Sequence, residues 1–203
     1  MWEIFIFVNP MGNRCLKTEK CIIDFAKQNN ITAHFQFIAL GNINVVNRFM
    51  RRNNMDPCDL KLRNKITKNI YDATLYCKAA NFQGKRKGRQ FIMTLQNSIN
   101  IDHKEYSVKL LKEIAAKTKI DWNTLSTDMK DPFTTDQCKD DQRKANEIGI
   151  NTTPATVIYD YDTPCSQNAM LIQSCTMQEF HAALDDLACK QMPSKLPDLR
   201  ILK

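Results

Sequence analysis

Four residues directly after the first apolar segment have the spacing of a dithiol site with one thiol missing. The segment 3–8 is apolar, and Gly12-Asn13-Arg14-Cys15 follows it closely. Thiol–disulfide exchange commonly uses a Cys-x-x-Cys pair, because one thiolate attacks the disulfide and the second thiol resolves the mixed product. Gly12 stands where the attacking cysteine would be. The pattern therefore favours binding over dithiol chemistry and leaves Cys15 as the candidate catalytic residue, acting as a monothiol.

Cys15 falls in the first turn of an expected helix. Free amides and the helix dipole lower the pKa of an exposed thiol at such a position, but burial raises the pKa and makes the thiol a poor attacking group. We interpret Cys15 as structural rather than nucleophilic. Arg14 beside the same amides keeps an anion-binding site open. A hairpin of the last strands would bring Cys175 near Cys15, and an unpaired Cys175 is the simpler alternative.

The dipeptide Thr153-Pro154 precedes a second apolar segment and is the other candidate binding element. A cis X-Pro bond would orient an unpaired Thr153 backbone toward an extended peptide, which could then add as a strand. The alternative is that Pro154 only begins an edge strand. We predict a cis bond that lies opposite the start of the first helix. The binding surface would then consist of Gly12, Asn13, Arg14, Thr153 and Pro154.

The N-terminal residues are expected to form a β-α-β unit. The apolar run 3–8 is typical of a strand that is covered on both faces. Residues 15–29 have apolar positions at helical spacing, and residues 31–40 alternate as a strand does. A right-handed crossover would pair the two strands in parallel.

The middle of the chain predicts helices throughout. From residue 43 to 149 apolar residues recur at helical spacing, and Thr134 with Gln137 resembles a capping box. Strand patterns return at 155–159 and 169–173, and a last helix follows them. No strand is expected inside the helical region.

This order of elements is β-α-β, helices, β-β-α, which is a thioredoxin-like α/β fold with a large all-helical insertion. We predict a four-stranded mixed sheet. The expected domains are a discontinuous thioredoxin-like domain of residues 1–42 and 150–192, a helical insertion of residues 43–149, and a C-terminal tail of residues 193–203.

Composition indicates a cytoplasmic protein that does not span a membrane. The longest apolar runs are far shorter than the roughly 18 residues of a membrane helix, and the N-terminus lacks the pattern of an export signal. Eight cysteines in such a chain are expected to be free thiols. They form no close pairs, and the three histidines are far apart, so we expect neither a metal nor a cofactor.

A net charge of +7 raises the question of a nucleic-acid partner. The basic stretches Lys61–Lys65 and Lys85–Arg89 lack interleaved aromatic residues and a recognisable reading motif. We therefore predict no nucleic-acid binding and interpret these stretches as solvated helix faces. An acidic protein partner remains an alternative, because a basic surface would steer its association.

Two segments resemble the DsbA family, and within it the YjbH/SpxH group. Residues 83–96 resemble that group's second insertion helix. Residues 133–157, with Cys138, Asp140 and the stretch 145–150, resemble the approach to its cis-proline strand. The resemblance implies an adaptor that delivers an Spx-like transcription factor to the ClpXP protease. Gly12 departs from the family's Cys-x-x-Cys pattern and speaks against redox activity.

The leading interpretation is thus a non-enzymatic adaptor whose partners would be an Spx-like regulator and ClpXP. One alternative is a thiol-disulfide oxidoreductase or isomerase of the DsbA family, working through Cys15. Another is a kappa-type glutathione-transferase-like enzyme that uses the insertion as a small-molecule pocket. The sequence leaves the oligomeric state open.

Overall fold

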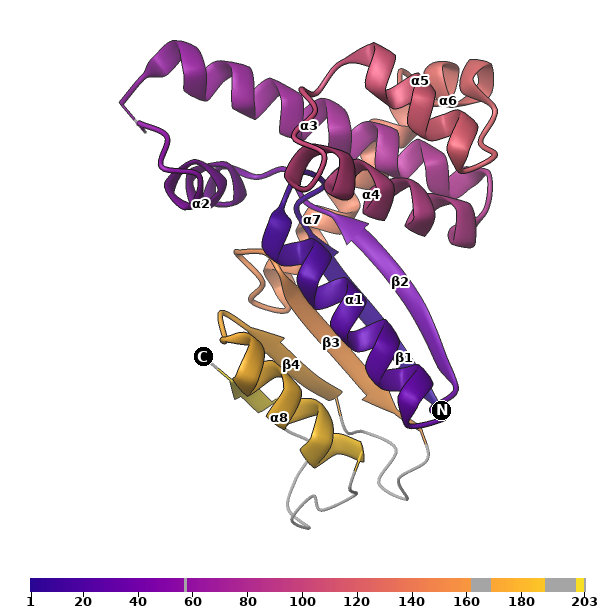
Figure 1. The fold of residues 1–203 in the computed structure, drawn as a ribbon, viewed down its shortest axis with the longest axis vertical. Coiled ribbons are helices and arrows are strands. Elements are labelled where there is room, and N and C mark those ends of the chain that lie inside the picture. The colour runs from indigo at the N-terminus through magenta and orange to yellow at the C-terminus, as the bar shows by residue number, and fades with distance from the viewer. Residues whose placement is uncertain (57, 162–168, 189–199, 203) are drawn as a thin grey trace.

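The computed structural model describes residues 1–56, 58–161, 169–188 and 200–202 (Figure 1). These residues form one mixed sheet with helices on both faces and a group of helices beyond one end. The strands are β1 (Trp2–Val8), β2 (Ala33–Ala39), β3 (Ala155–Asp160), β4 (Ala169–Gln173) and β5 (Arg200–Leu202). The helices are α1 (Asn13–Gln28), α2 (Ile43–Arg52), α3 (Leu60–Phe82), α4 (Lys85–Asn100), α5 (Val108–Lys117), α6 (Trp122–Asp128), α7 (Pro132–Glu147) and α8 (Met177–Ala188).

The sheet has the strand order β2-β1-β3-β4-β5. β1 pairs in parallel with β2, as the predicted crossover requires, and antiparallel with β3. β3 and β4 are antiparallel neighbours, and the short β5 adds in parallel to β4. The four predicted strands are confirmed. β5 is a fifth strand formed by residues 200–202 of the expected tail, while residues 193–199 and 203 of that tail lie outside the described residues.

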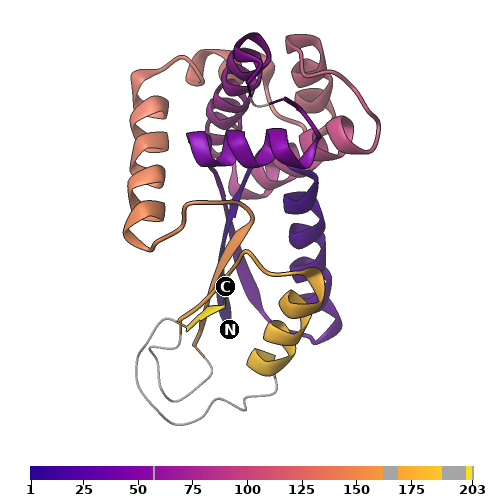
Figure 2. The same cartoon turned by 90° about the vertical axis from the view of Figure 1, so that its left-hand side faces the viewer.

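Alternate residues of the strands face two separate cores. Ile4 and Ile6 of β1 are fully buried on the side where α1 and α8 contribute Ile22 and Leu184. Phe7 belongs to the second core, on the side where α7 packs. Figure 2 shows the sheet nearly edge-on, with α1 and α8 on one side and α7 on the other. Because strand side chains alternate between faces, the one apolar run of β1 supplies both cores.

Between β2 and β3 the described chain contains helices and no strand, as predicted. The two long helices α3 and α4 approach each other at Gly88. A Cβ atom at this position would lie 1.9 Å from Oδ1 of Asn81 and 2.9 Å from the Cα atom of Asn81. The lack of a side chain at Gly88 is therefore what lets α4 lie against the α3 backbone.

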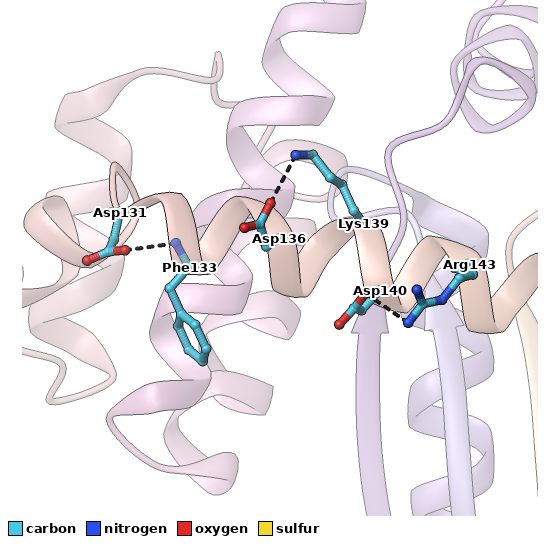
Figure 3. Close-up of polar contacts among 6 residues, drawn as sticks. All are labelled: Asp131, Phe133, Asp136, Lys139, Asp140 and Arg143. Atoms are coloured by element: carbon cyan, nitrogen blue, oxygen red, sulfur yellow. Dashed lines mark hydrogen bonds and ion pairs between the residues drawn. The ribbon is translucent and has the colours of Figure 1, made fainter.

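Helix α7 begins earlier than the sequence pattern suggested. The Asp131 side chain caps it by accepting a hydrogen bond of 2.8 Å from the Phe133 amide, and Pro132 takes the first helical position. The predicted cap at Thr134 is wrong, because Thr134 lies within the helix and its hydroxyl donates to the Asp128 carbonyl. Ion pairs one turn apart follow on its surface (Figure 3): Asp136 with Lys139, and Asp140 with Arg143.

Replacing Gly88 by alanine should lower the free energy of unfolding by roughly 1–3 kcal/mol, because the methyl group must displace Asn81 and the α3 backbone. Helix propensity alone would favour alanine by about 1 kcal/mol. Denaturant unfolding followed by circular dichroism measures the change. Gln90→Ala, at an exposed position of the same helix, is the control and should change it by less than about 0.5 kcal/mol. A Gly88→Ala variant as stable as this control would contradict the close approach of α3 and α4.

Candidate functional site

The start of α1 is formed by Gly12 as the N-cap residue, and it has no side-chain cap. The backbone angles of Gly12 are φ −88° and ψ 121°, which any residue adopts, so the turn does not require glycine. A Cβ atom at Gly12 would lie 3.1 Å from the Cys15 Sγ atom. A side chain at this position would therefore press against the remaining thiol and against Asn9, whose Cβ atom would lie 3.2 Å away.

The Cys15 thiol is buried, and only 1% of the residue is exposed. Its Sγ atom accepts a hydrogen bond of 3.3 Å from the Asn9 amide. Burial, and next the nearby Glu19 carboxyl, raise the pKa of Cys15 to about 12, against the opposing effects of the Asn9 amide, the Thr153 side chain and the Arg52 guanidinium. A thiol with this pKa is protonated at neutral pH and is a poor nucleophile.

One turn further along α1, Glu19 is a fully buried carboxyl that the sequence analysis did not single out. Its Oε1 atom accepts a hydrogen bond of 2.8 Å from the Gln96 side chain of α4, which also donates to the Asn9 carbonyl over 3.1 Å. Burial is the main reason that the pKa of Glu19 rises to about 8. The carboxyl is therefore mostly protonated at neutral pH, and these hydrogen bonds connect α1, α4 and the loop after β1.

The Thr153-Pro154 peptide bond is cis, as predicted. The Thr153 side chain is buried and hydrogen-bonds the Cys15 thiol. Thr153 and Cys15 line the same hollow, so the cis-proline loop does lie against the start of α1. The expectation of an unpaired Thr153 backbone is wrong in part, because the Arg52 guanidinium donates a hydrogen bond of 3.3 Å to the Thr153 carbonyl.

Three arginines gather around this loop. Arg14 comes from the first turn of α1, and Arg48 and Arg52 come from successive turns of α2. Two adjoining hollows share all three, one with Thr153 and the other with Pro154 in its wall. Sequence analysis named Arg14 and missed the other two, although Arg48 and Arg52 have the i, i+4 spacing that puts them on one helix face.

The arginines are held by neutral partners. Arg14 donates to the Cys175 carbonyl, and Arg48 lies 3.5 Å from the Ser174 hydroxyl. Within the described part of the chain none of the three arginines has an ion-pair partner. Burial, and then repulsion by the other two guanidiniums, lower the pKa of Arg52. The three guanidiniums therefore concentrate positive charge at the site. Among the described acids, Glu179 lies within their influence: its pKa is lowered by hydrogen bonds with Thr176 and, to a smaller extent, by the charge of Arg14.

The other residues predicted for the binding surface are divided between the two adjoining hollows. Gly12, Asn13 and Arg14 line the hollow with Thr153, and Pro154 lines its neighbour. Cys15 and Cys175 are both free thiols and form no disulfide. The basic stretch that begins at Lys85 lies at the start of α4, outside both hollows.

Two further expectations concern metals and membranes. The described residues contain no group of three or more histidine, cysteine or acidic side chains placed to hold a metal ion. None of the described helices combines the length and hydropathy needed to cross a membrane.

A family model described as Thioredoxin matches residues 5–182. The chain belongs to the thioredoxin family. Among solved structures, a DsbA oxidoreductase from Xylella fastidiosa superposes with a TM-score of 0.62 at 9% identity, covering 94% of this chain and 86% of the other. A thioredoxin-like oxidoreductase from Silicibacter pomeroyi DSS-3 gives a TM-score of 0.60 at 16% identity, covering 94% and 88%. The predicted DsbA-like thioredoxin fold is confirmed.

Sequence relatives lie in the group that the sequence analysis named. The chain is 22% identical over 174 residues to the ClpXP adapter protein SpxH of Bacillus subtilis (strain 168). This alignment covers 78% of the chain and 58% of the relative. The chain is also 22% identical over 160 residues to the ClpXP adapter protein SpxH of Staphylococcus haemolyticus (strain JCSC1435), covering 79% and 56%. The resemblance to SpxH is confirmed, and the chain spans a little over half the length of these relatives.

The Glu19→Gln variant should be more stable than the wild type, by a margin that grows from pH 5 to pH 8. The unfolded carboxyl loses its proton near pH 4.5 and the folded one near pH 8, so between these values the folded wild type holds the extra proton. Its free energy of unfolding should then fall by roughly 1.4 kcal/mol per pH unit, a loss that glutamine avoids. Below about pH 4.5 both states are protonated and this difference disappears.

Urea unfolding at pH 5, 6.5 and 8 measures this margin. Glu105→Gln, an exposed acid, is the matched control and should give a pH-independent difference. If the curves for the Glu19→Gln variant and the wild type ran parallel across this range, the raised pKa would be disproved.

The wild type should not reduce insulin disulfides, whereas Gly12→Cys should gain a reducible pair. The new Cβ atom would lie 3.1 Å from the Cys15 Sγ atom, and oxidised glutathione can drive disulfide formation between neighbouring thiols by exchange. Mass spectrometry after alkylation, with and without dithiothreitol, counts the thiols. Gly12→Ser adds similar volume without a thiol and is the control. Insulin turnover by the wild type that is lost in Cys15→Ser would contradict a structural role for Cys15.

Proposed function

We propose that this chain is an adaptor that binds a protein partner for ClpXP proteolysis, without dithiol redox chemistry. The SpxH relatives support the adaptor function, and an Spx-like regulator is the partner class that the resemblance implies. The chain spans 58% of the length of the Bacillus relative. Delivery of the bound partner to the protease is therefore proposed for this chain by analogy with that relative. A cytoplasmic location belongs to the same proposal.

The observation that carries this proposal is the set of three arginines around the cis-proline loop. Guanidinium groups bind carboxylates with paired, charge-assisted hydrogen bonds. The hydrogen-bond partners of Arg14, Arg48 and Arg52 in the described structure are neutral, so an acidic segment would supply a counter-charge in direct contact. An extended segment could also pair with the Thr153 backbone if the Arg52 side chain moved from the carbonyl onto the ligand.

A thiol-disulfide oxidoreductase is the second candidate, because the solved neighbours include DsbA enzymes. The fold alone carries this likeness, since the identities are 12% and 9%. The residues of this chain oppose the activity, because Gly12 replaces one thiol and the pKa of the other is raised to about 12.

Replacing both Arg48 and Arg52 by glutamate should weaken the binding of purified Spx by at least about tenfold, since two attractive contacts become repulsive. Isothermal titration calorimetry at low salt measures the affinity. Cys15→Ala should bind nearly as the wild type, because the thiol is buried and lies behind the surface.

The matched control is Lys61→Glu with Lys65→Glu. It makes the same change in net charge at two exposed positions of α3. Equal weakening in both double variants would mean that only net charge matters. Unchanged affinity in the arginine variant would place the interface elsewhere.

A further inference from the structure

A second hollow lies on the other face of the sheet, between β1, β2, β3 and helix α7. Its volume is about 410 Å³, within the usual range for small-molecule sites. It shares no lining residue with the hollows at the cis-proline loop. Figure 2 shows α7 standing on the side of the sheet away from α1 and α8. The hollow is therefore a separate candidate site.

The floor of this hollow is aromatic and apolar. Phe5 and Tyr159 meet edge to face, with ring centroids 5.8 Å apart, and both remain partly exposed. Phe7 and Val157 lie beside them and belong to the second core. Of the described residues of helix α7 only Ala145 belongs to this core, and the C-cap residue Ile148 packs against it. The helix therefore leaves part of the sheet uncovered. Exposed aromatic rings next to a concave surface are typical of ligand sites.

The rim of the hollow carries an excess of positive charge. Lys78 is paired with Asp141 at 2.6 Å, and Glu147 is a second acid in the lining, so three lysines of the lining face two carboxylates. Lys85 and Lys144 also line the hollow, and in the described part of the chain neither has an ion-pair partner. Their two charges come from different helices, α4 and α7, and they flank one aromatic floor. A ligand that matches this surface would combine an apolar part with an acidic group.

We propose that this hollow binds a small amphipathic carboxylate. The aromatic or aliphatic body of the ligand packs on Phe5, Val157 and Tyr159, and its carboxylate is held by Lys85 and Lys144. Burial of the body contributes roughly 25 cal/mol for each Å² removed from water, while the charge-assisted contacts fix the orientation. The volume favours a small molecule over a partner helix, since a helix with side chains is about 10 Å wide and would need a longer groove.

The probe for the test is 2-naphthoate, with uncharged 2-naphthamide as its isosteric control. Amide chemical shifts from NMR titration locate the site and give the affinity. We expect shift changes in β1, β3 and α7, and weaker binding of the amide. Lys85→Gln with Lys144→Gln should weaken 2-naphthoate binding by about tenfold, since two charge-assisted contacts are lost.

Arg86→Gln with Lys139→Gln is the matched control. It removes the same charge from exposed positions of the same two helices, outside the lining of the hollow, and should change the affinity less than about twofold. Both pairs are solvent-exposed, so neither should disturb folding.

Three results would overturn the proposal: equal binding of the acid and the amide, equal effects of the two double variants, or shift changes confined to the arginine site. Binding of acidic peptides alone, with no response to 2-naphthoate, would also overturn it and assign the surface to a protein partner. Because the Spx titration probes different residues, failure here leaves the adaptor proposal standing, and the reverse also holds.

Discussion

Two side chains of α4, Gln96 and Asn100, tie the helical region between β2 and β3 to the start of α1. The Gln96 amide donates both to the Asn9 carbonyl after β1 and to the buried Glu19 carboxyl, and Asn100 one turn later donates to the Met11 carbonyl. Removing a partner from buried groups of this kind leaves unsatisfied polar atoms, which costs about 1–3 kcal/mol each. The turn that carries Gly12, Arg14 and Cys15 is thereby fixed from the insertion side. The positions of Arg14 and Cys15 depend on that turn.

Burial of Cys15 and Glu19 determines their protonation states and therefore the reactivity of the site. A carboxyl and a thiol one turn apart lie in an apolar interior, and both are favoured in their neutral forms. The positive charges lie outside this interior, on the arginines of α1 and α2. The site thus combines an unreactive thiol with a surface suited to anions. In a thioredoxin-family scaffold this combination is consistent with recognition rather than electron transfer.

The two proposed binding surfaces lie at different places on the same β-sheet, one at its end and one on the face that α7 covers. On one side, α1 and α8 bury Ile4 and Ile6 of the central strand β1, and the arginine site lies at the end of the sheet near the cis-proline loop. On the other side α7 covers the strands incompletely, and Phe5 and Tyr159 stay partly exposed. Binding at the end of the sheet relies on charge and backbone pairing. Binding on the open face relies on apolar contact, with charge only at the rim.

Periodicity in the sequence determined the order of strands and helices, because alternation and helical spacing are local consequences of which side chains must be buried. The glycine at position 12 of the dithiol pattern and the cis bond at Thr153-Pro154 could also be predicted, because both belong to short local motifs. Other features are non-local. Arg48 and Arg52 reach the site only because α2 folds back over the cis-proline loop, and the pKa of Glu19 rises only because tertiary packing buries its carboxyl. The cap of α7 at Asp131 was missed because Thr134 with Gln137 offers an equally good local pattern, and tertiary packing chose between them. The sequence by itself thus determined the secondary structure and the short local motifs. Only the tertiary structure determined which groups are buried and which charges, distant in the sequence, lie close together.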